Sequence, residues 1–418
     1  MTVAPAVRST SAARRKSASV VALEALYDLG FATLIIIAGS QGVYRFLPPL
    51  LLWAMLYAML ALKFATNFRP LMIAVRDNIA LFAYPAAALL SATWSIEPGH
   101  TLYSGMQLSV TYLMGIWLGW RYRPGAIILA ILGGLAPLVA LSLVNYATGM
   151  FGAVFADGGG LLGIFSNKNT LGRMAMLLAL AALALMLGTR QRPLGRAALL
   201  GLLAMAGLAL LLSKSATSAI VMIAAAGLFV ALTMPGYRTS TRLAIALAGS
   251  LAFIGGCALL AFGDVDPVGG VLNAFGKSSN LTGRTSLWAI AGRQIDTAPW
   301  LGVGFDAYWD SGAFRAVDRI QNSFGTGLIS FHDFILDVWV GTGVPGLVGI
   351  GLTIGGAAFL CLRAYLARRD VEGAAMLAFF AALIGVALFN PLLYCQHENA
   401  IVILIAFGVS SRISLARR

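Results

Sequence analysis

The chain has 418 residues, of which 59% are hydrophobic and only 11% are charged, and its mean hydropathy is +0.86. This composition excludes a protein whose main solvent is water and indicates an integral membrane protein. The formal net charge of +13 could suggest a nucleic-acid partner, but the basic residues are distributed unevenly between alternate loops, as in membrane topology, and we expect no nucleic acid to bind.

Apolar runs of bilayer-spanning length recur along the whole chain. A hydrocarbon core about 30 Å thick requires about 20 mainly apolar residues in a helix. We therefore predict an all-α polytopic membrane protein with about twelve transmembrane helices. The predicted spans are 27–44, 46–62, 78–95, 101–120, 124–147, 168–188, 196–213, 215–234, 242–263, 344–364, 371–390 and 399–414.

The first 26 residues form a basic segment rich in Ser and Ala. Glu24 interrupts the beginning of the apolar run, and no convincing small-residue cleavage site follows the first span, so we interpret this segment as a retained cytoplasmic tail and not as a cleaved signal. The chain then divides into the tail at 1–26, helices one to nine at 27–263, a large loop at 264–343, and the last three helices with a short tail at 344–418.

The distribution of basic residues predicts the orientation. If the N-terminus lies in the cytoplasm, every loop on that side carries Lys or Arg, and most of the 29 basic residues fall there. By the positive-inside rule both termini are then cytoplasmic and the loop at 264–343 is extracytoplasmic. The basic residues outside this pattern are Arg45, Lys168, Arg173, Lys214, Lys277, Arg284, Arg293, Arg315 and Arg319.

Cys257, Cys361 and Cys395 fall in or beside separate spans, without the spacing of a disulfide framework or a zinc site. We interpret them as small buried hydrophobic residues, and we expect neither a metal nor a cofactor.

The loop at 264–343 is the one long connection. It carries many Asp residues together with Gly, Trp and Tyr, so it is polar enough to lie outside the lipid and apolar enough to pack on the bundle. A structureless loop of this length would be unusual, and we predict helices at 283–297, opened by Thr282 as N-cap, at 304–318, and at 332–342 leading into the next span. Together these helices would cover the bundle as a cap.

Ionisable groups close to the hydrocarbon are costly and therefore indicate function when they face the bundle. Lys214, in LLLSKSATS, lies in so short a turn that its ammonium group must stay near the outer interface, although it could simply extend toward lipid headgroups. Arg284, in NLTGRTSLW, begins an amphipathic helix, where its guanidinium group and backbone N–H groups could hold a phosphate. Arg284 could also be a solvated surface residue.

His332 is a candidate general base, because a neutral imidazole can take a proton from a hydroxyl group. The alternative is an ordinary histidine at the beginning of a helix. His100 and His397 are also predicted on the outer side, which weakens the case for any single histidine.

A glycine-rich segment at 158–163 precedes Asn167, Lys168 and Asn169 at the start of the sixth predicted span. Asn side chains commonly cap helix N-termini, which is one interpretation. The other is that this polar segment holds an anionic group beside the membrane. Two or three cations and one base on the outer side would suit an anionic lipid-phosphate substrate.

Six short segments occur in the order found in a known family. Together they make the chain resemble the O-antigen ligase and polysaccharide polymerase family of bacterial inner-membrane glycosyltransferases. Within the family, GVGFDAYW and Lys214 are more similar to exopolysaccharide repeat-unit polymerases than to O-antigen ligases, which usually have Arg at the position of Lys214. His332-Asp333 departs from the His-Asn pair that is common in the family. The segments are SATWSIEP at 91–98, GIFSNKNTLGRMAML at 163–177, LLSKSATS at 211–218, LTGRTSLW at 281–288, APWLGVGFDAYW at 298–309 and FHDFILDVWVGTGVPGLVG at 331–349.

The resemblance implies a GT-C-like, metal-independent enzyme whose donor is a saccharide linked to a polyprenyl diphosphate such as undecaprenyl diphosphate. Lys214 and Arg284 would bind the diphosphate and stabilise it as it leaves, and His332 would activate the acceptor hydroxyl, with inversion at the anomeric carbon. Asp333 could orient His332 or raise its pKa. Further residues would bind the diphosphate or the sugars, namely Asn167, Lys168, Asn169, Arg315, Arg319, Trp288 and Trp309. Packing alone could explain the two aromatic residues among them.

We therefore expect a glycosyltransferase at the periplasmic face of the bacterial inner membrane that joins lipid-linked repeat units into exopolysaccharide. Its expected partners are the bilayer, the lipid-linked donor, the glycan acceptor and, as candidates, a chain-length regulator and export proteins. The alternative is an O-antigen ligase that transfers finished glycan to lipid A-core. A polysaccharide or lipid transporter would instead require ionisable residues along a pathway through several spans, whereas the mid-span positions are almost wholly apolar.

Overall fold

The computed structural model describes residues 18–152, 154–156, 159–188, 192–234, 236–238, 240–242, 244–245, 248, 284–309 and 330–417. Over these residues the regular secondary structure is helical, apart from an isolated bridge between Phe155 and Leu161. The α-helices are α1 (Ala18–Ala38), α2 (Pro49–Thr66), α3 (Phe68–Asp77), α4 (Ala83–Leu90), α5 (Pro98–Arg121), α6 (Pro124–Thr148), α7 (Lys168–Gly188), α8 (Pro193–Ser213), α9 (Ala216–Thr233), α12 (Arg284–Thr297), α14 (Phe334–Arg368), α15 (Val371–Ala387) and α16 (Asn399–Ala416). Short 3-10 helices are η1 (Gly42–Arg45), η2 (Ile79–Phe82) and η3 (Ser91–Thr93).

Seven helices in the described part of the chain are long and apolar enough to cross a membrane. An eighth span results if α3 and the segment Ile79–Thr93, which are bent by 76°, are counted as one. The chain is therefore an all-helical polytopic membrane protein, as predicted. The count of about twelve spans stays a prediction, because the span at 242–263 lies almost entirely outside the described residues. The seven helices are α2, α6, α7, α8, α9, α14 and α16.

The span predicted at 78–95 corresponds to the helical segment Ile79–Thr93. Within it η2, α4 and η3 follow one another without a gap, and α3 precedes it at the sharp bend. Pro85 falls within the first turn of α4, where proline is tolerated, so the apolar run stays helical through it.

The predicted cap helices are found in part. α12 agrees with the helix predicted at 283–297, whereas residues 304–309 form turns, so the prediction of a helix over 304–318 is wrong for its first residues. The physical reason is that the first backbone N–H groups here have other partners, since Gly304 N–H donates to the Gly341 carbonyl of α14 at 2.7 Å and Phe305 N–H donates to Ser91 Oγ at 3.0 Å. Hydrogen bonds to a neighbouring element replace those that a helix would supply. Residues 310–318 and the N-cap prediction for Thr282 lie outside the described residues.

α14 joins the helix predicted at 332–342 to the span predicted at 344–364. The joint is Gly343, whose backbone (φ 62°, ψ −154°) is not helical. A Cβ atom at Gly343 would meet the carbonyl group of Trp300, which instead accepts a hydrogen bond from Val344 N–H at 2.9 Å. Glycine is required here by both its dihedral angles and this close approach. The kink therefore fixes α14 against the loop that follows α12.

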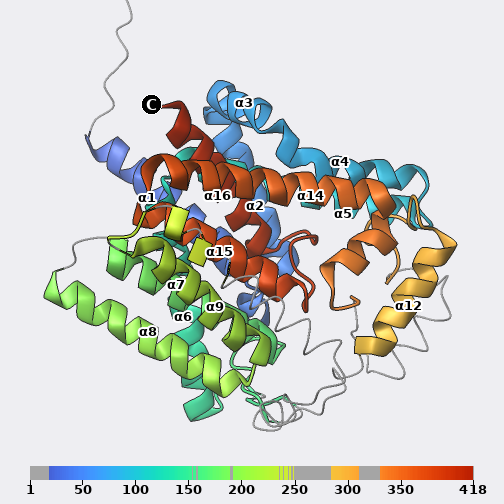
Figure 1. Cartoon of the computed structure of the whole chain (residues 1–418). Coiled ribbons are helices and arrows are strands. Elements are labelled where there is room, and N and C mark those ends of the chain that lie inside the picture. The colour runs from blue at the N-terminus through green and yellow to red at the C-terminus, as the bar shows by residue number, and fades with distance from the viewer. Residues whose placement is uncertain are drawn as a thin grey trace, which may run out of the picture.

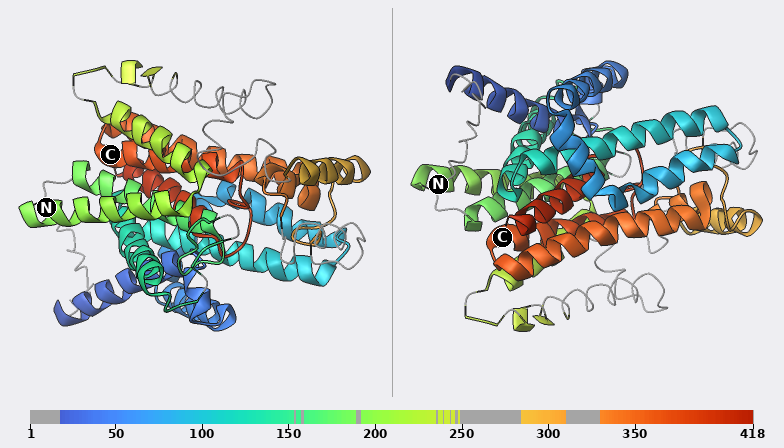
Figure 2. Two further views of the ribbon diagram at one scale, coloured as in Figure 1. Left: turned by 90° about the horizontal axis from the view of Figure 1, so that it is seen from below. Right: turned by 90° about the horizontal axis from the view of Figure 1, so that it is seen from above.

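α7 and α16 form the centre of the bundle. In each of these helices, 72% of an 18-residue apolar stretch is buried, compared with 22% of the corresponding stretch in α2 and in α8. The exposed apolar side chains of α2 and α8, such as Leu50 and Leu208, are suited to contact with lipid tails. α8 accordingly lies at the edge of the bundle, and α12 lies at the end opposite the C-terminus, beside the beginning of α14 (Figures 1 and 2).

Two glycines one turn apart bring α5 against α16. Gly115 and Gly119 form a G-x-x-x-G pattern, which allows close packing of membrane helices. A Cβ atom at Gly115 would lie 2.8 Å from Ile405 Cβ, and one at Gly119 would meet the carbonyl oxygen of Ala406. The α5–α16 contact therefore depends on the absence of side chains at these positions.

We predict that Gly119→Ala destabilises the protein by about 1–3 kcal/mol, because the added methyl group meets backbone that cannot move aside cheaply. The matched control is Gly133→Ala in α6, where a Cβ atom would have nothing within 4 Å. The measurement is the thermal midpoint of each purified variant in detergent. Equal midpoints for the two variants would contradict the packing assignment.

The end of the bundle opposite α12 carries a charge cluster around the buried Asp28. Asp28 of α1 accepts from Lys63 and Arg121, each at 2.5 Å. Lys63 and Arg121 are among the residues that the charge distribution assigns to the cytoplasm. This end also contains the last part of α16, because Ser410 Oγ donates to the Tyr122 carbonyl at 2.9 Å.

Candidate active site

A cavity of about 850 Å³ lies at the end of the bundle away from this charge cluster. Its volume is in the range of small-molecule sites. It is formed by η1, by the beginnings of α2, α5 and α7, by the turns before α14, and by the loop between α15 and α16. The lining residues are Gln41, Tyr44, Pro49, Leu50, Trp53, Ala54, Tyr57, His100, Tyr103, Gln107, Asn167, Asn169, Thr170, Arg173, Asp306, Trp309, His332, Asn390, Pro391, Tyr394, Cys395, Gln396, His397 and Glu398.

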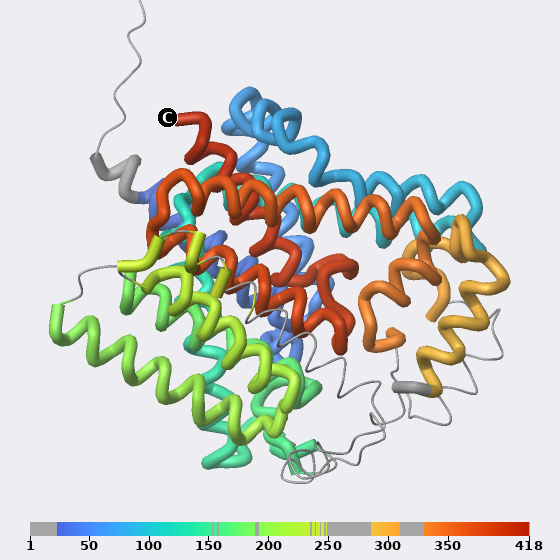
Figure 3. The backbone as a smooth tube through the Cα atoms, in the orientation of Figure 1, coloured from blue at the N-terminus to red at the C-terminus, as the bar shows by residue number. Residues whose placement is uncertain are grey.

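All 3 histidines of the chain line this cavity. His100 comes from the first turn of α5, His332 from the turn before α14, and His397 from the loop before α16. In Figure 3 the red trace of that loop turns toward the orange trace at the beginning of α14. The three histidines, which the sequence predicts on the outer side, therefore share one site.

His332 is held at the cavity by its neighbours in the chain. It adopts a left-handed backbone conformation with φ 56°. The preceding residue, Phe331, donates its N–H to Asp337 Oδ1 at 3.0 Å and accepts from Trp288 Nε1 at 3.2 Å. Trp288 does not line the cavity, and its hydrogen bond to the Phe331 carbonyl positions the turn that carries His332.

Asp333 caps α14. Its Oδ1 atom accepts from Ile335 N–H at 2.8 Å and from Leu336 N–H at 3.2 Å. Burial raises the pKa of the Asp333 carboxyl group, and the two backbone hydrogen bonds oppose that rise. Asn and Asp are comparably good N-caps, which explains why Asp can stand where Asn is common. Asp333 is also a neighbour of His332 in the chain, and any effect on its pKa stays a prediction.

His397 is enclosed by aromatic side chains. Its ring stacks on Trp53 with centroids 4.0 Å apart and planes at 16°, and Nε2 lies 2.5 Å from the Tyr57 hydroxyl oxygen. Burial lowers the pKa of His397 to about 4. The imidazole is therefore neutral at neutral pH, and the cavity does not gain a positive charge from it.

A pair of lysines lies beside the cavity at the glycine-rich turn. Lys214, which ends α8 with φ 49°, places Nζ 3.3 Å from the position that a Cβ atom would have at Gly159. Lys168 places Nζ 3.4 Å from the corresponding position at Gly160. Within the described part of the chain neither lysine has an ion-pair partner. Two ammonium groups thus lie around one turn.

Asn167 and Asn169 flank Lys168 and connect this lysine pair to the cavity, which both of them line. Asn167 Oδ1 accepts from Asn169 N–H at 2.7 Å at the beginning of α7. The local hydrogen bond matches the capping interpretation of this segment. The position on the cavity wall leaves the amide group of Asn169 available to a ligand.

The structure brings together only some of the residues predicted from sequence. His332, Trp309, Asn167 and Asn169 line the cavity, whereas Lys168 and Lys214 are not among its lining residues and lie at the glycine-rich turn. Arg284 begins α12, and its side chain lies outside the described residues, as do Arg315 and Arg319 entirely.

Arg173 and Glu398 were given no role by sequence reasoning. Both line the cavity and are nearly fully buried, at 5% and 4% exposure, with Arg173 Nη2 and Glu398 Oε2 3.6 Å apart. Gln41 Nε2 donates to the other carboxylate oxygen at 3.2 Å. Burial raises the pKa of Glu398, and the charge of Arg173 opposes the rise. The signal that could have found them is an ionisable residue beside an apolar helix.

These features define a polytopic membrane protein with a cavity lined by polar and aromatic side chains at one end of its helix bundle, and with two lysines at the turn beside Asn167 and Asn169. The chain belongs to the O-antigen ligase family. A family model described as O-antigen ligase matches residues 200–351, which include Lys214, Arg284 and His332. The chain is also 30% identical over 328 residues, 74% of its own length and 73% of the relative, to the exopolysaccharide production protein ExoQ of Rhizobium meliloti (strain 1021).

Proposed function

We propose that this protein is an inverting glycosyltransferase that polymerises oligosaccharide repeat units linked to a polyprenyl diphosphate into exopolysaccharide, at the periplasmic face of a bacterial inner membrane. Membership of the O-antigen ligase family supports a glycan-processing membrane enzyme. The similarity to a protein named for exopolysaccharide production favours a polymer as product. The distribution of basic residues predicts the side of the membrane.

The observation that carries this proposal is that His332 lines one cavity with Asn167 and Asn169, which flank Lys168, and that Lys168 and Lys214 lie together at the glycine-rich turn. A glycosyl donor of this class has an anionic diphosphate next to the reacting carbon. The reaction needs a base for the acceptor and cations for the leaving group, and both kinds of group occur here. Arg284, at the N-terminus of α12, is a third candidate cation from the facing segment.

In the proposed reaction His332 accepts the proton of the acceptor hydroxyl group as its oxygen attacks the anomeric carbon of the donor sugar. A new glycosidic C–O bond forms, the C–O bond to the diphosphate breaks, and the lipid diphosphate leaves with the electron pair. Attack from the opposite face inverts the anomeric configuration. The lysine pair stabilises the charge on the leaving diphosphate, where poor hydration strengthens the attraction.

The remaining predicted residues belong to the same proposal. Arg315 and Arg319 would assist in binding the diphosphate or acidic sugars, and Trp309 and Asn169 would contact the saccharide. A chain-length regulator and export proteins are the candidate partners. O-antigen ligase activity, with lipid A-core as acceptor, is the second candidate, and the description of the matching family favours it.

The test is a reaction of the purified protein in lipid nanodiscs with repeat units linked to a polyprenyl diphosphate. We expect a ladder of longer glycans with new glycosidic bonds and release of free lipid diphosphate. In a deletion strain, unpolymerised repeat units would support the polymerase, and undecorated lipid A-core would support the ligase. Movement of the glycan across the bilayer without new bonds would overturn the proposal in favour of a transporter.

A further inference from the structure

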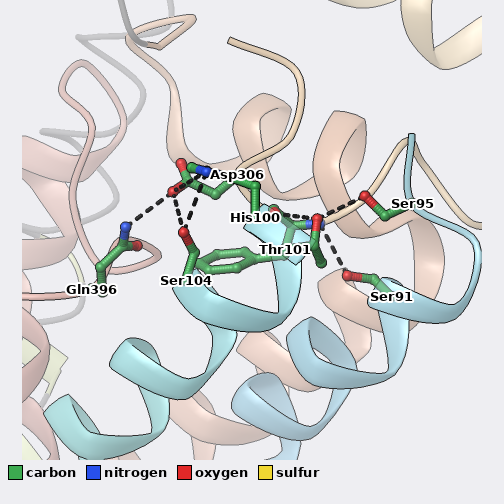
Figure 4. Close-up of polar contacts among 8 residues, drawn as sticks. Ser91, Ser95, His100, Thr101, Ser104, Asp306 and Gln396 are labelled. Atoms are coloured by element: carbon green, nitrogen blue, oxygen red, sulfur yellow. Dashed lines mark hydrogen bonds and ion pairs between the residues drawn. The ribbon is translucent and has the colours of Figure 1, made fainter. Parts of the chain in front are cut away.

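A second polar cluster lies in the cavity around Asp306 (Figure 4). Its Oδ2 atom accepts from Ser104 Oγ at 2.8 Å and from Gln396 Nε2 at 3.0 Å, and it lies 3.3 Å from His100 Nε2. We call Asp306, His100, Ser104 and Gln396 the Asp306 cluster. It joins α5, the turns after α12 and the loop between α15 and α16, and three of its four members line the cavity.

The backbone around Asp306 is fixed independently of these contacts. Phe305 N–H donates to Ser91 Oγ at 3.0 Å, and its carbonyl accepts from Thr101 Oγ1 at 3.0 Å. Asp306 itself has a left-handed conformation with φ 59°. Such a conformation is uncommon for a residue with a side chain and is kept only where the surroundings enforce it. The carboxylate is therefore aimed by the fold.

The two carboxylate oxygens of Asp306 differ in their contacts. All the contacts given above are to Oδ2, and among the described residues no hydrogen bond is made to Oδ1. The side chain is 36% exposed on the cavity wall. A carboxylate that only tied three segments together would be expected to be buried with both oxygens satisfied. One oxygen is thus held by the protein while the other is available to a ligand.

The charge of the cavity indicates what that ligand is. The carboxylate of Asp306 repels a phosphate, whereas the lysine pair attracts one at another part of the cavity edge. A charged acceptor oxygen beside the donors His100 and Gln396 suits hydroxyl groups instead. Trp309, one turn further along the chain, also lines the cavity, and its ring lies 4.8 Å from that of Phe331, the residue before His332.

We propose that the Asp306 cluster and Trp309 form the subsite for the acceptor saccharide, the sugar whose hydroxyl group is presented to His332. Asp306 Oδ1 accepts hydrogen bonds from sugar hydroxyls, His100 and Gln396 complete the polar wall, and the Trp309 ring offers an apolar face. The negative end of the cavity then takes the acceptor and the lysine pair takes the donor diphosphate. This inference rests on the proposed glycosyltransferase function.

The test variant is Asp306→Asn, because Asn tolerates the left-handed backbone and removes only the charge and one acceptor. The probe is the free oligosaccharide repeat unit, released from its lipid by mild acid, which has no diphosphate and can act as a soluble acceptor. We expect its KM as acceptor and its Kd by calorimetry to rise about tenfold, the difference between a charge-assisted and an ordinary hydrogen bond. The KM for the lipid-linked donor should change by less than about twofold.

The matched control is Asp296→Asn, an exposed carboxylate on α12 that does not line the cavity. Gln396→Ala is the second variant, and it should raise the same acceptor constants without changing the backbone at Asp306. Unchanged acceptor KM and Kd in both cluster variants would overturn the subsite while leaving polymerisation by the wild-type protein intact. Absence of polymerisation by the wild-type protein would instead overturn the proposed function, and the calorimetry would still decide whether Asp306 binds saccharide.

Discussion

Replacing His332 by Asn will lower the rate of glycosidic bond formation by about 10²–10⁴-fold, the usual contribution of a positioned general base. Asn is preferable to Ala because the backbone at His332 has φ 56°, a conformation that Asn adopts more readily, so the loss will report on chemistry more than on strain. The measurement is the single-turnover rate with saturating donor and acceptor. Substrate binding should be little changed, because the imidazole acts on a proton in the transition state.

The matched control for this variant is Arg369→Asn. Arg369 has the same φ of 56°, is exposed, and ends α14 away from the cavity. It should have wild-type activity and a similar thermal midpoint. A His332→Asn protein that forms polymer of normal length at the normal rate would remove His332 from the role of base, and His100 and His397 would then be the histidines left to test.

Replacing both Lys168 and Lys214 by Ala will weaken donor binding by about 100-fold, with about tenfold from each single substitution, because each removes a charge-assisted contact to the diphosphate. The measurement is the KM for the lipid-linked donor at several salt concentrations. The wild-type KM should rise with salt, and the double variant should lose most of that dependence. The acceptor KM should stay nearly constant.

The conservative variant Lys214→Arg should recover most of the donor affinity, since it restores the charge at the same turn. Arg196→Ala is the matched control, because Arg196 is an exposed cation at the opposite end of α8. If Lys168→Ala and Lys214→Ala leave the donor KM and its salt dependence unchanged, the diphosphate does not bind at this turn. Arg284 would then be the next cation to substitute.

Several parts of this protein follow from the sequence by itself. The membrane class and the positions of most helices are predictable because a helix in lipid must satisfy its own backbone hydrogen bonds and must present apolar side chains over a fixed length. The predicted roles of Lys168, Lys214 and His332 follow from local signals, namely charge next to apolar spans and motifs in a fixed order. These signals depend on residues close together in the chain, which is why they can be read without a structure.

Local composition was insufficient where neighbouring segments compete for the backbone. Residues 304–309 looked helical, but Gly304 N–H pairs with the Gly341 carbonyl of α14 and Phe305 N–H pairs with Ser91 Oγ. The bend of 76° between α3 and Ile79–Thr93 was likewise not predicted from composition. In both cases a contact or a bend in the tertiary structure decides what local propensity leaves open. Asp333 likewise looked like a partner for the base, and the structure shows its carboxylate capping α14.

Only the tertiary structure decided which polar residues share one cavity. His100 and Asp306 are 206 positions apart in the chain and Gln396 is a further 90 positions away, yet their side chains meet within 3.3 Å. No periodicity or motif couples such distant residues, because their meeting depends on how α5, α14 and α16 pack as whole helices. The sequence alone therefore determined a helical membrane protein and predicted a base and cations near one surface. Only the folded chain placed Asp306, His100 and Gln396 on the wall of the cavity that His332 also lines, because packing of whole helices brings distant residues together.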